Sequence, residues 1–171
     1  MNSFREVTPD NFICSPFKSI GSDWMLIAAS DGERVNAMTA SWGGMGVLWG
    51  KNCVFIFVRE SRFTKELIDS SNGFSVTFFD REKYAGMLGY MGKASGRNED
   101  KIASAGLTVL GGDVPYFEQA QTAILCDKLC RLNVPKECIL SDEALSRYYP
   151  NGDYHDMYVG EIKKILVKDS E

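Results

Sequence analysis

The chain has 171 residues, of which 44% are hydrophobic and 25% are charged, as in an ordinary globular protein. Its net charge is −4 and it contains no long basic run, which argues against nucleic acid as a partner. It also contains no run of 18 apolar residues and no signal-peptide pattern. We therefore expect one cytoplasmic domain over residues 1–171, with no membrane partner.

The five cysteines and the one histidine, His155, limit the possible metal chemistry. An odd number of cysteines without a CxxC pair argues against a disulfide framework and against a structural zinc site. One imidazole cannot form a site that needs several histidines. We therefore expect free, buried thiols and no metal.

The N-terminal part of the chain is predicted to contain a β-hairpin. Asp31-Gly32 is a strong two-residue turn signal, because such a turn needs positive φ angles. It separates two apolar stretches, 25–29 and 34–40, which we predict to be strands. Before them we expect an irregular arm over residues 1–15 and a turn of helix over 17–23.

A glycine cluster at 43–46 predicts a loop in which backbone could approach a ligand closely, and a plain turn is an equal alternative. The spacing is neither GxGxxG nor a Walker P-loop. After it, residues 53–58 read as a strand and 64–70 as a helix. Ser61 or Thr64 is expected to cap that helix.

The C-terminal part is predicted to be rich in short strands. Residues 74–79 alternate between apolar and polar and predict a half-buried strand, and 83–91 predict a helix whose Gly86 and Gly89 permit close packing. Many short strands spaced by turns, with few long helices, indicate a β-barrel with appended helices. Further expected elements are a short helix at 98–105, an extended segment at 115–117, strands at 121–132, 139–140, 154–162 and 165–167, and a helix or loop at 141–149. The spacing at 121–132 would also fit a helix.

The junction after the strand at 53–58 suits an anion, because it combines two arginines and two hydroxyls with a helix start. Helix N-termini offer free N–H groups and a positive dipole end, and arginine adds forked hydrogen bonds to phosphate. The alternatives are core packing for Met38 and Trp42 and a surface ion pair for Arg59. Our hypothesis is that the phosphate of a flat cofactor is held by Arg59, Ser61, Arg62 and Thr64, with its ring lined by Asn36, Met38, Thr39, Ser41 and Trp42.

Four segments resemble the flavin reductase-like, or flavoredoxin, family. They are N-A-M-T-A-S-W at 36–42, V-R-E-S-R-F-T at 58–64, S-G-R-N-E-D-K at 95–101 and H-D-M-Y-V-G-E-I at 155–162. The resemblance implies an FMN-binding split β-barrel that is a homodimer, with FMN near the subunit interface. It also implies that the first segment lines the FMN ring and ribityl chain and that the second holds the phosphate.

A second basic loop is matched by the same resemblance. Ser95, Gly96 and Arg97 correspond to a segment that lies near the cofactor in such proteins. Lys93 is added on the basis of its charge and its proximity to this loop. Without the resemblance, a solvated connector would be the preferred interpretation.

The resemblance implies an FMN-dependent oxidoreductase that passes electrons from NADH or NADPH to flavin or to another acceptor. The flavin performs the chemistry, so no side chain is named as a catalytic acid or base. One alternative is a non-enzymatic FMN electron carrier that works with a redox partner protein. A second is a binding module for another flat cofactor.

His155 is the candidate on the substrate side. In a regular strand His155 and Tyr158 face opposite ways, so they cannot both point at one site. His155 either contacts the electron donor or acceptor above the flavin ring, or only forms a hydrogen bond with the neighbouring turn at 150–153.

Overall fold

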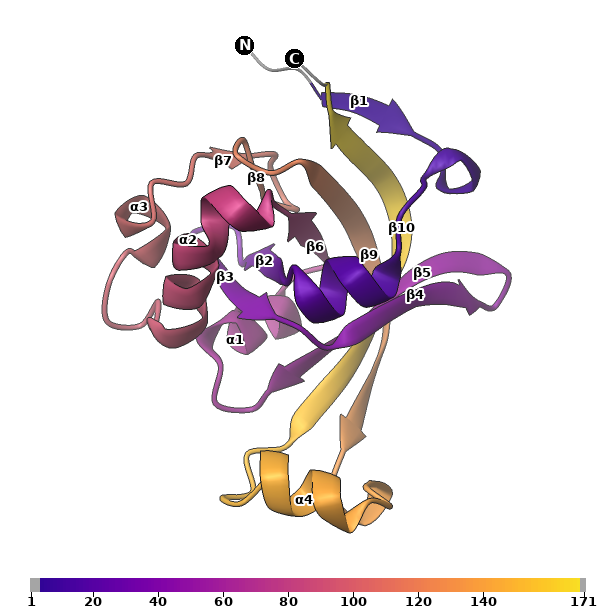
Figure 1. Ribbon diagram of the computed structural model, residues 1–171, viewed down its shortest axis with the longest axis vertical. Helices are drawn as coiled ribbons and strands as arrows, with labels where there is room; N and C mark the ends of the chain where they lie inside the picture. Colours follow the sequence, from indigo (N-terminus) through magenta and orange to yellow (C-terminus); the bar gives the residue numbers. More distant parts are fainter. Residues whose placement is uncertain (1–3, 170–171) are drawn as a thin grey trace.

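The computed structural model describes residues 4–169 and contains a sheet of eight strands with helices around it (Figure 1). The hydrogen-bonded order is β3-β2-β6-β9-β10-β5-β4, and β1 pairs with β10. The strands are β1 (Phe4–Val7), β2 (Met25–Ser30), β3 (Val35–Ala40), β4 (Gly43–Leu48), β5 (Lys51–Arg59), β6 (Gly73–Phe78), β7 (Val109–Leu110), β8 (Tyr116–Phe117), β9 (Thr122–Val134) and β10 (His155–Lys168). The helices are η1 (Pro9–Asn11), η2 (Phe17–Ser22), α1 (Phe63–Ser70), α2 (Arg81–Lys93), α3 (Lys101–Ser104), η3 (Lys136–Cys138) and α4 (Asp142–Tyr148).

Side chains of β2 alternate between two hydrophobic cores. Met25 and Ile27 join Leu67 of α1 on one face, whereas Leu26 joins Leu88 of α2 on the other. Helices α1 and α2 therefore cover opposite faces of β2 and its neighbour β3. This two-sided burial explains why β2 is a continuous apolar run rather than an alternating one.

The predicted fold class, mainly β with appended helices, is confirmed. Among residues 4–169 the hydrogen-bonded path of strands is open, since β3 and β4 at its two ends do not pair with each other. These two strands follow one another in the chain and are joined by Ser41 and Trp42 alone. The residues predicted to line the cofactor ring therefore lie at the open seam of the sheet.

Two stretches predicted to be irregular are strands. Residues 4–7 pair with β10 as β1, and the rest of the predicted arm up to residue 3 lies outside the described residues. The glycine cluster forms β4, which pairs with β5. A Cβ at Gly43 would lie 2.5 Å from the Phe55 carbonyl oxygen, so glycine allows the two strands to approach. Pairing with β5 thus overrides the low strand propensity of glycine.

The β2–β3 hairpin is confirmed, but its connection has four residues, 31–34, instead of a two-residue turn. The Asp31 carboxylate accepts hydrogen bonds from the backbone N–H groups of Glu33 and Arg34 and from the Arg34 guanidinium. These contacts lower the pKa of Asp31 to about 2, led by the Arg34 backbone and side chain. The Asp31 side chain, which accepts hydrogen bonds from backbone N–H groups two and three residues further on, therefore sets the length of the loop.

Four further predictions are wrong in part. Strand β6 is buried on both faces rather than half-buried, and residues 139–140 follow the turn η3 without forming a strand. The two strands expected at 154–162 and 165–167 are one strand, β10. A Cβ at Gly86 or Gly89 would meet nothing within 4 Å, so these glycines do not serve close packing.

The helices are short, and no helix within residues 4–169 is long and apolar enough to cross a membrane. Helix α1 begins at Phe63, and its N-cap residue, Arg62, makes no side-chain capping bond, so the predicted caps Ser61 and Thr64 are wrong. The cysteine side chains are all free. The expectation that they are buried holds for Cys53 and Cys126, whereas Cys14 and Cys130 are only partly buried and Cys138 is exposed.

Candidate functional site

The junction between β5 and α1 is held by the segment that precedes β10. Ser61 donates its backbone N–H and its hydroxyl to the Asp153 carboxylate, at 3.2 and 2.6 Å. The Arg59 guanidinium donates to the backbone carbonyls of Tyr148 and Asp153. Sequence analysis did not identify Asp153, since nothing local shows that the turn before β10 meets this junction.

Two adjoining cavities lie beside this junction. One, of about 140 Å³, opens at the seam between β3 and β4, and we call it the seam cavity. The other, of about 160 Å³, lies against the start of α1, and we call it the inner cavity. They share Met38, Arg59 and Arg62. The predicted residues at the seam cavity are Met38, Thr39, Ser41, Trp42, Arg59, Arg62 and His155. Those at the inner cavity are Asn36, Met38, Arg59, Ser61, Arg62, Thr64, Lys93, Ser95 and Gly96.

The seam cavity has mixed walls, in which apolar and aromatic side chains lie beside hydroxyls and two arginines. Met38 is 5% exposed and belongs to the main core, so it is both a core residue and a cavity wall. Trp42 is 36% exposed and makes an edge-to-face contact with Tyr148 at 4.9 Å between ring centroids. The Thr39 hydroxyl donates to the Leu88 carbonyl of α2 at 2.6 Å, so it already has a protein partner.

The inner cavity is lined by four cations, Arg59, Arg62, Lys93 and Lys101. Among residues 4–169, none of the four lies within ion-pair distance of a carboxylate. The one carboxylate in the cavity wall, that of Asp153, bonds to Ser61 instead. Uncompensated cations around one cavity, in a chain of net charge −4, indicate a site for an anion.

Lys101 is the cation of the inner cavity that was not predicted from the sequence, although it ends the matched segment at 95–101. It is 3% exposed, and its ammonium donates to the carbonyls of Met91 and Ala94, each at 3.1 Å. Burial, and then the charge of Arg62, lower its pKa to about 8. An ammonium has three donors, so two carbonyl bonds leave one N–H for a ligand.

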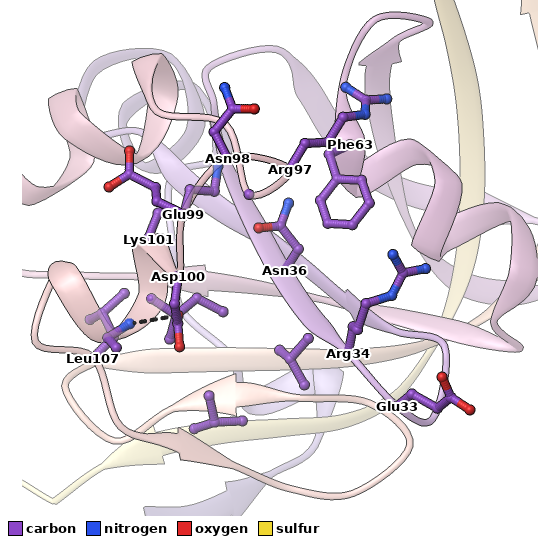
Figure 2. Close-up of a pocket in the computed structure, with 15 residues that line it drawn as sticks. Glu33, Arg34, Asn36, Phe63, Arg97, Asn98, Glu99, Asp100, Lys101 and Leu107 are labelled. Carbon is purple, nitrogen blue, oxygen red and sulfur yellow. Dashed lines mark hydrogen bonds between the residues drawn. The ribbon is translucent and has the colours of Figure 1, made fainter.

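Arg97 lies outside both cavities. It lines a larger groove of about 640 Å³ on the outer side of the loop at 95–97 (Figure 2). Its guanidinium donates to the Ser61 carbonyl and pairs with Glu66. Arg97 therefore contacts the junction between β5 and α1 through the Ser61 carbonyl and does not line the inner cavity. The groove shares with the inner cavity Asn36, Phe63, Gly96 and Lys101.

A close contact between Asn36 and Gly96 joins the two matched segments. The Asn36 amide donates to the Thr64 hydroxyl at 2.9 Å, and a Cβ at residue 96 would overlap the same amide side chain. Only glycine at this position allows the loop to reach β3. The two hydroxyls proposed for phosphate, Ser61 and Thr64, thus both have protein partners.

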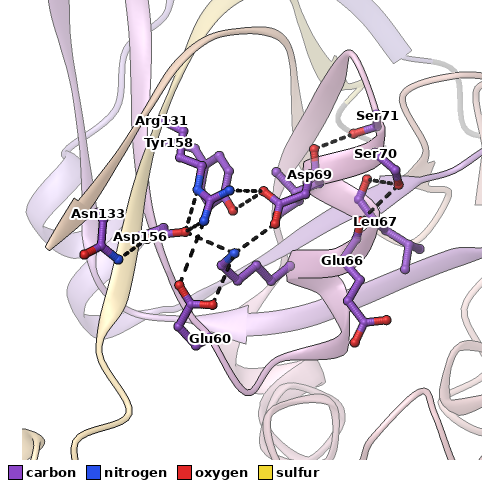
Figure 3. Close-up of polar contacts among 12 residues, drawn as sticks. Glu60, Glu66, Leu67, Asp69, Ser70, Ser71, Arg131, Asn133, Asp156 and Tyr158 are labelled. Atoms are coloured by element: carbon purple, nitrogen blue, oxygen red, sulfur yellow. Dashed lines mark hydrogen bonds and ion pairs between the residues drawn. The ribbon is translucent and has the colours of Figure 1, made fainter. Parts of the chain in front are cut away.

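A compensated charge network joins α1 to β9 and β10 (Figure 3). The buried Lys65 ammonium lies 3.0 Å from the Asp156 carboxylate of β10 and 2.8 Å from Asp69. Arg131 pairs with the same two carboxylates. Burial would lower the pKa of Lys65, but the hydrogen bonds that its ammonium donates to Asp69 and Asp156 outweigh it and raise that pKa. Neighbouring Tyr158 donates to Asp69 at 2.6 Å.

Strand alternation separates His155 from this network. Asp156 and Tyr158 face α1, whereas His155 faces Tyr149 and Trp42. The prediction that His155 and Tyr158 point to different places is confirmed. His155 lies at a cavity and is buried, at 6% exposed. It also bonds to Tyr149, just before the turn at 150–153, so it combines features of both predicted roles.

Fold and site together define a mainly β protein with a cation-lined cavity next to a cavity that Trp42, Phe57 and His155 line in part. A family model for the flavin reductase like domain matches residues 17–171. The flavoredoxin of Desulfovibrio vulgaris (Miyazaki F) aligns with a TM-score of 0.66 and 26% identity, over 84% of this chain and 68% of that chain. An FMN-binding domain of a flavin reductases-like enzyme from Shewanella baltica OS155 aligns with a TM-score of 0.68 and 13% identity, over 97% of this chain and 78% of the other.

A curated relative is the high molecular weight rubredoxin of Moorella thermoacetica, which is 26% identical over 100 residues. That match covers 58% of this chain and 43% of the relative, so it spans less than half the relative's length. The chain belongs to the flavin reductase-like domain family.

Proposed function

We propose that the bound flavin is FMN, with its phosphate in the inner cavity and its ring at the seam cavity. The observation that carries this proposal is the set of four cations around one cavity without a paired carboxylate. FMN ends in a phosphate, which is doubly charged at neutral pH and suits such a donor set. The open seam at Ser41 and Trp42 lies next to this cavity, as a ring attached to the phosphate would require.

Different residues bind the phosphate, orient the junction between β5 and α1, and line the ring. Arg59, Arg62, Lys93 and Lys101 supply charge to the phosphate, together with the free N–H groups at the start of α1. Asn36, Ser61 and Thr64 orient the junction through their bonds to each other and to Asp153. Arg97 supports the junction from behind through the Ser61 carbonyl. Ser95 and Gly96 close the loop over β3, and the ring is lined by Met38, Thr39, Ser41 and Trp42.

FMN, when bound, supplies hydride and single-electron chemistry. The chain positions it and limits the access of water through the apolar walls formed by Met38, Trp42 and Phe57. We infer an oxidoreductase that takes electrons from NADH or NADPH. A flavoredoxin-like electron carrier with a redox partner protein is the second candidate. The alignment with flavoredoxin over 84% of the chain favours it.

We further propose that the protein is a homodimer that acts as one domain per chain. A largely apolar cavity of about 600 Å³ adjoins the seam cavity through Ser41 and Trp42. Phe17, on the wall of this cavity, is 90% exposed, and nearby Ile13 in the chain is 97% exposed. Such side chains favour burial against another subunit.

The functional proposal is tested by mixing the FMN-loaded protein with NADH or NADPH without oxygen and following the flavin absorbance. Bleaching by either nucleotide supports an oxidoreductase. Retention of FMN without bleaching overturns that function and leaves the electron carrier. A purified protein that does not retain FMN contradicts both.

A further inference from the structure

His155 makes one defined hydrogen bond. Its Nδ1 lies 2.8 Å from the Tyr149 hydroxyl oxygen. The Tyr149 ring is held from two sides, since Tyr154 stacks on it at 5.1 Å and the Arg59 guanidinium lies 5.2 Å from its centroid. This phenol is therefore fixed before any ligand binds.

The imidazole is neutral at physiological pH. Burial, and then the charges of Arg59 and Arg62, lower the pKa of His155 to about 4, while Asp153 acts in the opposite direction. Burial also raises the pKa of Tyr149, so its hydroxyl keeps its proton. A neutral imidazole carries one N–H and one acceptor nitrogen.

The direction of the hydrogen bond follows from the strengths of the two groups. Among residues 4–169, the Tyr149 hydroxyl has no polar partner other than His155, and either tautomer leaves one donor, the phenol O–H or Nε2–H, without an acceptor in the protein. The phenol is the more acidic donor and the unprotonated imidazole nitrogen is the more basic acceptor. Tyr149 therefore donates to Nδ1, which places the imidazole proton on Nε2.

The other ring nitrogen is free for a ligand. No protein partner of Nε2 is found among residues 4–169, and the one buried side-chain atom there without a partner is Nη1 of Arg81. Nε2 is therefore not sealed in the interior, and His155 lines the seam cavity. The Trp42 ring lies 5.1 Å from the imidazole on the same wall.

We propose that Tyr149 is a positioning residue that locks His155 in its Nε2–H tautomer, so that the seam cavity presents a fixed neutral N–H donor. Its ligand class is a heteroaromatic with a carbonyl oxygen or an unprotonated ring nitrogen at its edge. That the flavin is this ligand rests on the proposed function, whereas the tautomer does not. A donor that needs no protonation works at the same strength across the physiological pH range.

The experiment is nitrogen-15 NMR of the histidine-labelled protein, where His155 is the one histidine and gives one pair of ring signals. In the ligand-free wild type between pH 5.5 and 8, we expect an unprotonated Nδ1 and a protonated Nε2. Tyr149→Phe removes the donor, and we expect the two signals to move toward each other as both tautomers become populated. Tyr148→Phe is the matched control, since the Tyr148 ring contacts Trp42 and not His155, and it should leave the signals unchanged.

A protonated Nδ1 in the wild type overturns the proposal. This test needs no variant, so it remains decisive even if Tyr149→Phe does not fold. Unchanged signals in a folded Tyr149→Phe protein overturn the role of Tyr149. Addition of FMN should shift the Nε2 signal while Nδ1 stays unprotonated. If FMN binds and Nε2 does not respond, the donor is not used by the flavin. If FMN does not bind, the proposed function fails and the tautomer result stands.

Discussion

Two groups of charged side chains lie near the start of α1, and they differ in how their charge is balanced. Around Lys65 each cation has a carboxylate, because Asp69 and Asp156 serve both Lys65 and Arg131. Among the described residues, no cation of the inner cavity lies within ion-pair distance of a carboxylate. Arg62 and Lys65 are three residues apart, so the local sequence alone does not decide which cations hold the fold and which await a ligand.

Whether the cations are paired with carboxylates determines whether each group contributes mainly to stability or mainly to ligand binding. A buried charge is costly without a partner, so removing one member of the Lys65 network should reduce stability strongly. A cation buried in the inner cavity without a partner reduces the stability of the fold, and a bound anion restores that stability. Its removal should therefore change ligand affinity more than the free energy of unfolding.

The largest expected effect is that of Lys65→Met. Asp156 is fully buried and would keep Arg131 and Asn133 but lose its ammonium partner. We expect the free energy of unfolding to fall by about 3 kcal/mol, at the lower end for a broken buried ion pair. Urea unfolding of the ligand-free protein measures this change.

Lys164→Met is the matched control, because Lys164 is exposed on the same strand as Asp156. It should change stability by less than about 0.5 kcal/mol. Equal small effects of the two substitutions would show that the network does not hold α1 to β10.

The sequence predicts the fold where local and global preferences agree. The apolar runs of β2 and β5 and the alternation at the start of β10 are strands as expected. The errors at β1 and β4 have different causes, since β1 pairs with β10 near the other end of the chain, whereas β4 pairs with the next strand, β5, and is concealed by its glycines. Gly43 disfavours a strand locally, but it is required where β4 approaches β5.

The sequence predicts which segments meet at the site, but it predicts less well which side chains line each cavity and which contacts they make. The matched segments do meet at the two cavities. Arg97 was predicted to lie near the cofactor but lines only the groove, whereas Lys101, which was not predicted, lines both the groove and the inner cavity. No local pattern identifies Asp153 or Tyr149, which reach the site only because β10 pairs with β5.

Arg62→Met should have the next largest effect, on FMN affinity. The Arg62 guanidinium donates to the Gly92 carbonyl at 2.8 Å and has no carboxylate partner among the described residues. A hydrogen bond to a charged group contributes about 1.5–3 kcal/mol, so FMN should bind roughly 10- to 150-fold more weakly. Fluorescence titration with FMN and riboflavin measures this loss, and riboflavin, which lacks the phosphate, should be affected little.

The stability of Arg62→Met should stay within about 1 kcal/mol of the wild type, unlike that of Lys65→Met. If the wild type binds riboflavin as tightly as FMN, the phosphate does not occupy the inner cavity. If Arg62→Met weakens both ligands equally, Arg62 acts on the ring or on the fold.

The smallest expected effect is a dependence of FMN affinity on pH that comes from Lys101. Its pKa is about 8 in the ligand-free protein, owing first to burial and then to Arg62. A phosphate bound beside it stabilises the charged ammonium and raises this pKa, so binding above pH 8 takes up a proton. The affinity for FMN should therefore fall as pH rises from 8 to 9.5, by at most about tenfold per pH unit.

The stability of the ligand-free protein should change in the opposite direction. A lysine whose pKa is lower in the folded than in the unfolded state binds fewer protons when folded, so its contribution to stability rises between pH 8 and its ordinary value of 10.5. Lys101→Met should abolish the pH dependence of FMN affinity over this range and flatten the rise in stability. Retention of both slopes in this variant would assign them to another group, and Lys93 would be the next residue to replace, because it is the other lysine on the cavity wall.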